Sequence, residues 1–130
     1  MTDQDEVRNL IARYFQLLDD RDFERWAALL VEGASVTING VERWPPDVQI
    51  MGQRGKHISV NQIIDVDTDS DSASAVFDYF YIAEIGPPRY ERLVVLSFGR
   101  YTDRFVRRDG GWMLQNVAMD VLYSDRLRDG

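Results

Sequence analysis

The spacing of apolar residues changes once along this chain, after residue 31, and this change constrains the fold more than any other feature. Over residues 3–19 the apolar side chains follow the helical period, with Tyr14 at the centre of the apolar arc. Asp22 is a suitable N-cap for a second helix over residues 23–31. From residue 34 onward the pattern is that of strands. Helices followed by strands are typical of an α+β domain.

Turn residues divide the later part of the chain into strands. Asn39-Gly40 and Asp109-Gly110-Gly111 are typical of tight hairpin turns, and the longest strand is a candidate for a bend at Gly99. A short helical turn is expected over residues 47–51. Two helices cannot cover both faces of such a sheet, so we expect one face to curve around them and the other to be free for another subunit. The strands are predicted over residues 34–39, 57–67, 72–84, 90–107 and 112–123.

Length and charge limit the classes of protein that this chain can belong to. With 130 residues and 45% hydrophobic content, residues 1–130 are expected to form a single domain. The net charge of −7 argues against nucleic-acid binding and against docking on anionic lipid. No apolar run is long enough to cross a membrane, and the start of the chain lacks the pattern of a signal peptide. We therefore expect a cytoplasmic protein with no membrane or nucleic-acid partner.

The reactive residue types are few. The chain has no cysteine, which excludes disulfides, cysteine-bound metals and thiol nucleophiles, and its one histidine excludes a two-histidine metal site. We expect no cofactor and no metal. A neutral imidazole is the natural general base near pH 7, so His57 is the first catalytic candidate. The alternative is an ordinary surface histidine beside Lys56.

Two residues of the first helix have the chemistry that such a base needs. Asp19, at the edge of the apolar arc, would fix the tautomer of His57 and favour the imidazolium. Tyr14 is expected to be buried, and a buried phenol aimed at a carbonyl oxygen stabilises an enolate. The alternatives are an exposed carboxylate at the helix end and a core tyrosine bound to backbone.

Asp78 interrupts an apolar strand, where an ionised carboxylate is costly to bury without a partner. By strand parity it shares a face with Phe80, while Tyr79 takes the other face. Asp78 is therefore expected to face a pocket, a partner charge or an edge. The strand aromatics, Phe80 among them, are candidates to line a pocket or an interface.

Tyr101 and Asp103 share strand parity and are candidates to line one cavity. The competing interpretation places Asp103 in cross-strand ion pairs on a solvated face, with Arg100, Arg104 and Arg107 as partners. Both interpretations of Asp103 stay open at this point.

Several short motifs together resemble the SnoaL-like branch of the nuclear transport factor 2-like superfamily, and the resemblance covers essentially the whole chain. The motifs are Arg13-Tyr14 with Asp19 and Asp22, Trp26, Gly33-Ala34, Lys56-His57, Gly99 to Asp103, and Arg107 to Trp112. The resemblance implies a cone-shaped fold, in which the N-terminal helices pack in the concave face of a curved, mostly antiparallel sheet and enclose an apolar pocket. Such relatives include scytalone and bile-acid dehydratases, ketosteroid isomerase, polyketide cyclases, limonene epoxide hydrolase and dioxygenase small subunits. Many of them are oligomers that pair through the outer face of the sheet.

The resemblance also implies roles for particular residues. Tyr14, Asp19, His57 and Asp78 match the dehydratase pattern as catalytic residues. Against ketosteroid isomerase, Tyr14 matches the tyrosine that binds the oxyanion, and Asp103 falls near the position of the protonated aspartate. The base of that enzyme would fall near Ile38 or Asn39, so this chain departs from the isomerase pattern there. The residues expected to bind substrate are Tyr101, Asp103, Phe80 and Trp26.

These features predict a cofactor-independent acid–base enzyme acting on a small cyclic or polyketide-like carbonyl compound, most concretely a dehydratase, and a homodimer or higher homo-oligomer. In this hypothesis His57 removes a proton, Asp19 orients it, Tyr14 supports the enolate, and Asp78 places the base or protonates the leaving hydroxyl. The alternatives are an isomerase or polyketide cyclase, for which Asp103 replaces Asp78 as the acid, and a non-catalytic ligand-binding or structural subunit.

Overall fold

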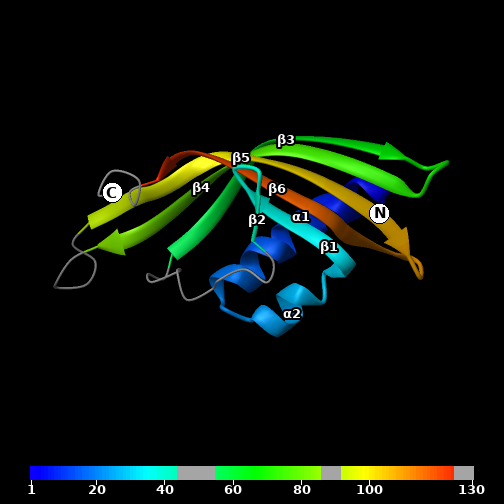
Figure 1. Cartoon of the computed structure of the whole chain (residues 1–130), viewed down its shortest axis with the longest axis horizontal. Helices are drawn as coiled ribbons and strands as arrows, with labels where there is room; N and C mark the ends of the chain where they lie inside the picture. The colour runs from blue at the N-terminus through cyan, green and yellow to red at the C-terminus, as the bar shows by residue number, and fades with distance from the viewer. Residues whose placement is uncertain (44–54, 86–91, 125–130) are drawn as a thin grey trace.

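The computed structural model describes residues 1–43, 55–85 and 92–124, and the predicted helical turn over residues 47–51 lies outside them. The elements are α1 (Asp3–Asp19), α2 (Phe23–Ala27), β1 (Leu30–Ile38), β2 (Val41–Glu42), β3 (Gly55–Asp67), β4 (Ser72–Ile85), β5 (Arg92–Arg108) and β6 (Gly111–Ser124). The strands form one six-stranded sheet in the order β2-β1-β6-β5-β4-β3, antiparallel except for the β1–β6 pair. The sheet arches over the two helices, and α1 lies along its concave face (Figure 1). The predicted α+β class and curved sheet are confirmed.

Local capping explains where the helices begin. The Thr2 side chain accepts a hydrogen bond from the Asp5 backbone N–H, and the Asp5 side chain accepts one from Thr2 in return. Asp22 caps α2 as predicted. The second helix is shorter than predicted, however, because Leu30 leaves it to pair with Leu114 of β6. Pairing with the sheet therefore overrides the helical spacing at this point.

Gly99 lies where the sheet bends. A Cβ atom there would be 2.1 Å from the carbonyl oxygen of Asp120, and the pairing of β5 with β6 shifts register between Phe98 and Gly99. The missing side chain lets the β6 backbone approach closely at an irregularity that increases local twist. This irregularity falls at the residue for which the sequence predicts a bend.

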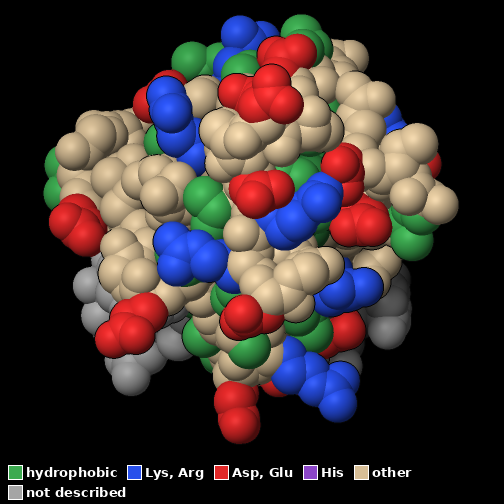
Figure 2. Space-filling view, turned by 90° about the vertical axis from the view of Figure 1, so that its right-hand side faces the viewer, with side chains coloured by type: hydrophobic (Ala, Val, Ile, Leu, Met, Phe, Trp, Pro, Cys, Tyr) green, Lys and Arg blue, Asp and Glu red, His purple; other side chains and the backbone are tan. Residues whose placement is uncertain are grey.

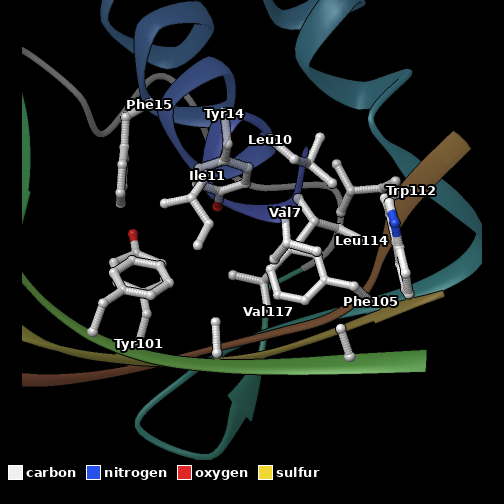
Figure 3. Close-up of a cluster of buried hydrophobic side chains, with 14 of the residues drawn as sticks. Val7, Leu10, Ile11, Tyr14, Phe15, Tyr101, Phe105, Trp112, Leu114 and Val117 are labelled. Carbon is white, nitrogen blue, oxygen red and sulfur yellow. The ribbon is translucent and has the colours of Figure 1, made fainter. Parts of the chain in front are cut away.

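The core fills the space between α1 and the sheet. The apolar stripe of α1, which includes Val7, Ile11 and Tyr14, packs against side chains of β4, β5 and β6 (Figure 3). Burial of this kind removes apolar area from water at about 25 cal/mol per Å². Figure 3 shows the Tyr14 hydroxyl pointing toward the sheet, so a polar atom is carried into this apolar layer.

The two faces of the sheet differ in character. Along β4, Phe77 and Tyr79 are buried on the concave side, while Asp78 and Phe80 alternate with them on the convex side, as strand parity predicts. At the end of the molecule where α1 begins, acidic and basic side chains are interspersed and no histidine is visible (Figure 2). In the part of the chain that the structure describes, no helix is long and apolar enough to cross a membrane.

Candidate active site

His57 and Asp19 form a close polar pair between β3 and α1. The imidazole Nδ1 lies 2.6 Å from Asp19 Oδ1, and the backbone N–H of His57 donates to the same carboxylate, 3.1 Å from Oδ2. Both side chains are largely buried, with 10% of His57 and 6% of Asp19 exposed. A carboxylate held at Nδ1 selects the tautomer with its proton there. The lone pair of Nε2 is then available to a reactant.

The position of Asp19 strengthens this arrangement. Asp19 is the last residue of α1, and the last turn contains no basic side chain. Helix C-termini carry partial negative charge and favour a nearby cation. His57 comes from β3, far along the chain, and supplies the only ionisable cation that contacts this carboxylate among residues 1–43, 55–85 and 92–124.

Two aromatic rings contact the imidazole. The ring of Phe15 stacks on it at 5.0 Å between centroids and 15° between planes, and the ring of Tyr81 lies 4.5 Å away at 35°. Tyr79 is a third neighbour, at 6.5 Å. The first two rings, one from α1 and one from β4, restrict rotation of the imidazole.

A second polar cluster surrounds Tyr14. The rings of Trp26 and Tyr101 pack against the Tyr14 ring, at 5.6 and 6.3 Å between centroids. Burial, and then the Asp103 charge, raise the pKa of Tyr14, while the polar groups of Trp26 and Tyr101 act in the opposite direction. Burial also raises the pKa of Tyr101 well above its ordinary value, and the neighbouring Tyr14 adds to this. Both phenols therefore keep their protons, and the Tyr14 hydroxyl has a proton to donate.

Asp103 is the buried carboxyl group of this cluster. Its side chain is 2% exposed, and Oδ1 finds no hydrogen-bond partner within the described ranges. Burial raises the pKa of Asp103 well above its ordinary value, against a hydrogen bond from the Ala118 backbone. A raised pKa favours the protonated form of this carboxyl group, in which it can donate a hydrogen bond. The ion pairs considered for Asp103 in the sequence do not form among the described residues, since Arg100 pairs with Asp78 and Arg107 with Asp3.

The structure connects these two clusters through aromatic rings. Phe15 contacts His57 on one side and the Tyr101 ring, at 5.3 Å, on the other. Tyr79 likewise lies 5.1 Å from Tyr101, and its hydroxyl is 2.7 Å from Ser97 Oγ. A base and two acids therefore share the concave side of the sheet.

Two of the predicted site residues are not brought to His57. Asp78 lies on the convex side, where Arg100 Nε donates to it at 2.8 Å and Asn61 Nδ2 at 3.0 Å. Of the three environments considered for Asp78, the structure shows a partner charge, that of Arg100. Phe80 is 38% exposed on the same convex side and contacts Phe98. Strand parity assigns these residues to one face but does not tell which face is concave.

Sequence reasoning missed the rings that hold the imidazole, Phe15 and Tyr81. Phe15 follows Tyr14 on the apolar arc, and Tyr81 is directly opposite His57 in the β3–β4 register. The sequence does not show which residue of β4 lies opposite His57, because the pairing register of β3 with β4 changes at an irregularity between Val60 and Ile63.

The described ranges hold no candidate metal site, and a depression in the surface lies away from His57. No group of three or more His, Asp or Glu side chains there could hold a metal ion. One depression of about 270 Å³ lies at the other end of the sheet, with Asp65, Ser74 and Arg104 in its lining. Its lining mixes polar and apolar side chains, and it does not include His57 or Tyr14.

Comparison with protein families identifies the domain. Residues 1–118 match the model of the SnoaL-like domain. The chain belongs to this family. The match includes both clusters, from Tyr14 to Asp103, and the resemblance noted in the sequence is confirmed. No curated protein matches the chain.

Solved structures show the same fold. An NTF2-like protein with a cystatin-like fold from Novosphingobium aromaticivorans is 21% identical, with a TM-score of 0.77, covering 98% of this chain and 87% of that one. A protein of the same organism assigned as a scytalone dehydratase is 21% identical, with a TM-score of 0.75 and coverage of 95% and 89%. ActVI-ORFA from Streptomyces coelicolor is 16% identical, with a TM-score of 0.74 and coverage of 90% and 95%. At these identities the likeness shows the fold, and the activity depends on the site.

Proposed function

We propose that this SnoaL-like protein is a cofactor-independent acid–base enzyme that forms an enolate from a small cyclic or polyketide-like carbonyl compound, most concretely a dehydratase. The observation that carries the proposal is the 2.6 Å contact of His57 Nδ1 with Asp19, which leaves Nε2 as a base on the same side of the sheet as Tyr14 and Asp103. The neighbour assigned as a scytalone dehydratase supports this reaction class.

Proton removal is the first step. His57 Nε2 takes a proton from the carbon next to the substrate carbonyl, and the electron pair moves onto the carbonyl oxygen. Asp19, bound to Nδ1, stabilises the imidazolium that forms. A positioned general base contributes roughly 10²- to 10⁴-fold to such a reaction.

The enolate oxygen is the second requirement. The Tyr14 hydroxyl and the protonated Asp103 carboxyl group are the donors proposed for it, with Trp26 and Tyr101 holding Tyr14. Donors fixed in a water-poor environment are worth roughly 10²- to 10³-fold each in rate. The proposed reaction requires the apolar pocket expected from the sequence to reach both these donors and His57.

Loss of water completes the proposed reaction. The enolate expels the hydroxyl group on the β carbon, a carbon–carbon double bond forms, and the imidazolium gives its proton to the leaving hydroxyl, which departs as water. With one histidine in the chain acting as both base and acid, proton and hydroxyl leave from the same face of the substrate. Asp78, paired with Arg100 on the convex side, has no part in this step.

An isomerase or a cyclase would form the same enolate, and the buried Asp103 makes these two reactions the second candidate function. In an isomerase the imidazolium returns its proton to another carbon, and in a cyclase the enolate carbon attacks a second carbonyl group. Analysis of the product of the active substrate separates the three reactions, because only dehydration releases water.

The partner expected besides the substrate is a second copy of the chain. Ile58, Phe80, Phe98 and Tyr123 are directly opposite one another across four strands on the convex side. Phe80 and Ile58 are 38% and 43% exposed. Contiguous exposed apolar side chains of this kind mark interaction surfaces. We propose that this row is covered in a homo-oligomer, and the cytoplasmic location stays a prediction from the sequence.

The test begins with a thermal-shift screen of cyclic ketones and β-hydroxyketones, because a ligand that binds the native state raises its melting temperature. Turnover of each hit is then compared for wild type, His57→Gln, Asp19→Asn and Asp20→Asn. We expect kcat to fall roughly 10²- to 10⁴-fold in His57→Gln, and less in Asp19→Asn. Asp20→Asn, which removes the same charge one residue further along, is expected to match wild type.

Near-wild-type turnover in His57→Gln would refute the proposed mechanism. Binding without turnover of any hit would favour the ligand-binding subunit.

A further inference from the structure

A glycine underlies the aromatic contact of His57. A Cβ atom on Gly55 would be 3.0 Å from two ring carbons of Tyr81 and 2.2 Å from the carbonyl oxygen of Ile82. Both contacts are shorter than real Cβ atoms tolerate comfortably. The absence of a side chain at Gly55 therefore lets the Tyr81 ring lie against the β3 backbone.

The register brings that ring to the imidazole. Gly55 and His57 are two residues apart on β3, so they share a face, and Tyr81 of β4 is directly opposite His57. The ring occupies the space over Gly55 and contacts the imidazole, with 4.5 Å between centroids. Phe15 of α1 contacts the same imidazole at 5.0 Å.

We propose that Tyr81, seated on Gly55, is a positioning residue for His57, and that with Phe15 it forms an aromatic clamp that keeps Nδ1 on Asp19 and Nε2 toward the reacting carbon. Rotation of the imidazole out of this plane breaks the 2.6 Å contact with Asp19 and moves both nitrogens. The faces of aromatic rings also attract cations, so the clamp favours the imidazolium formed by proton removal. The role of Nε2 rests on the proposed function, whereas the fixed ring and tautomer do not.

The single histidine makes this inference directly measurable. The Cε1–H and the two ring nitrogens of His57 give unique NMR signals because no other histidine is present. The nitrogen signals report which nitrogen carries the proton, and the shift of the Cε1–H signal reports the ring currents of the clamp. Neither readout needs a substrate.

The experiment compares wild type with Tyr81→Leu, which removes the ring, and with Tyr81→Phe, which keeps it. We expect Tyr81→Phe to retain the wild-type nitrogen signals and Tyr81→Leu to show a mixture of tautomers with a displaced Cε1–H signal. On an active substrate, kcat is expected to fall roughly ten- to a hundred-fold in Tyr81→Leu with KM little changed, because the base is misplaced while the binding residues remain.

Gly55→Ala is the second variant, since its Cβ atom meets the Tyr81 ring at 3.0 Å, as well as the Ile82 carbonyl oxygen at 2.2 Å, and displaces the ring without removing it. It is expected to shift the same signals in the same direction, and it keeps the inference testable if Tyr81→Leu does not fold. Unchanged nitrogen and Cε1–H signals in the folded variants would overturn the clamp, whatever the activity. If the wild-type protein turns over no substrate but the signals of His57 still change in Tyr81→Leu and Gly55→Ala, the proposed function is refuted and the clamp is supported.

Discussion

At the scale of single residues, the carboxyl groups of Asp103 and Asp78, on the neighbouring strands β5 and β4, have opposite environments. Asp103 is buried with an unpartnered oxygen, and burial raises its pKa. Asp78 accepts hydrogen bonds from Arg100 and Asn61, which lower its pKa. Carboxyl groups whose pKa values are pushed apart in this way commonly have different tasks. The structure therefore favours Asp103 over Asp78 as a hydrogen-bond donor to the proposed enolate.

Alanine substitution separates these two carboxyl groups. In Asp103→Ala we expect kcat to fall roughly 10²- to 10³-fold, because a donor to the enolate oxygen is lost. In Asp78→Ala we expect kcat within about twofold of wild type, because the side chain lies on the other face of the sheet. Steady-state kinetics on a substrate from the thermal-shift screen give both values. A large loss in Asp78→Ala with an intact fold would contradict this assignment.

The burial of Asp103 also predicts a pH dependence of stability. Because the folded pKa lies above the unfolded value of 3.8, the native state keeps a proton that the unfolded chain releases. The free energy of unfolding therefore decreases as pH rises from the unfolded pKa to the folded pKa, by about 1.4 kcal/mol per pH unit for this group. Above the folded pKa this contribution is constant.

Asp103→Asn lacks this titration, so its stability relative to wild type is expected to increase with pH over that interval. Urea unfolding of both proteins at a series of pH values measures the difference, in which other titrating groups cancel. A difference that stays constant with pH would show that Asp103 ionises equally well in both states.

At the scale of elements, α1 is attached to the sheet at both ends. Asp3 accepts hydrogen bonds from Arg107 and from Trp112 Nε1, and Asp19 is bound by His57. The Arg107 guanidinium also lies over the Trp112 ring, 4.8 Å from its centroid. The same attachments that place the helix on the sheet thus set the distance between Asp19 and His57.

The bend of β5 at Gly99 is expected to be sensitive to a single methyl group. Gly99→Ala places a Cβ atom 2.1 Å from the Asp120 carbonyl oxygen, so the backbone has to shift. We expect a loss of about 1–3 kcal/mol in the free energy of unfolding. Gly111→Ala is the matched control, because its nearest neighbour would be 3.9 Å away. Equal effects of the two substitutions in urea unfolding would show that close approach at Gly99 is not what the bend requires.

At the scale of the whole molecule, the curved sheet gives one covered face and one open face. Helix α1 covers the concave side (Figure 1). The apolar row Ile58, Phe80, Phe98 and Tyr123 lies on the convex side. Beside it, the Asp78–Arg100 pair lies next to Asp120, so polar groups border the row. An apolar centre with a polar border is the usual composition of a protein interface.

Phe80→Glu is expected to convert the homo-oligomer to a monomer, because a charge in the apolar row cannot be paired across a self-complementary interface. Sedimentation velocity at several concentrations measures the state of the protein. Gln16→Glu adds the same charge on the exposed outer side of α1 and is expected to leave the oligomer intact. A wild-type protein that is monomeric at every concentration would refute the proposed interface.

Much of the architecture follows from local patterns. The helix over residues 3–19 and the cap at Asp22 depend on neighbours in the sequence, and the structure has both. The second helix is the exception, because Leu30 has its partner in β6, far along the chain. Local spacing does not contain that pairing.

The site divides in the same way. The sequence by itself determined which residue types were present: one histidine as a base near neutral pH, a phenol on the apolar arc of the first helix, and no thiol. Only the tertiary structure decided which carboxyl groups meet them, placing Asp19 against His57, Asp103 beside Tyr14 and Asp78 against Arg100. The physical reason is that strand parity fixes which residues share a face, whereas sheet curvature and cross-strand register decide which face is buried and which side chains touch.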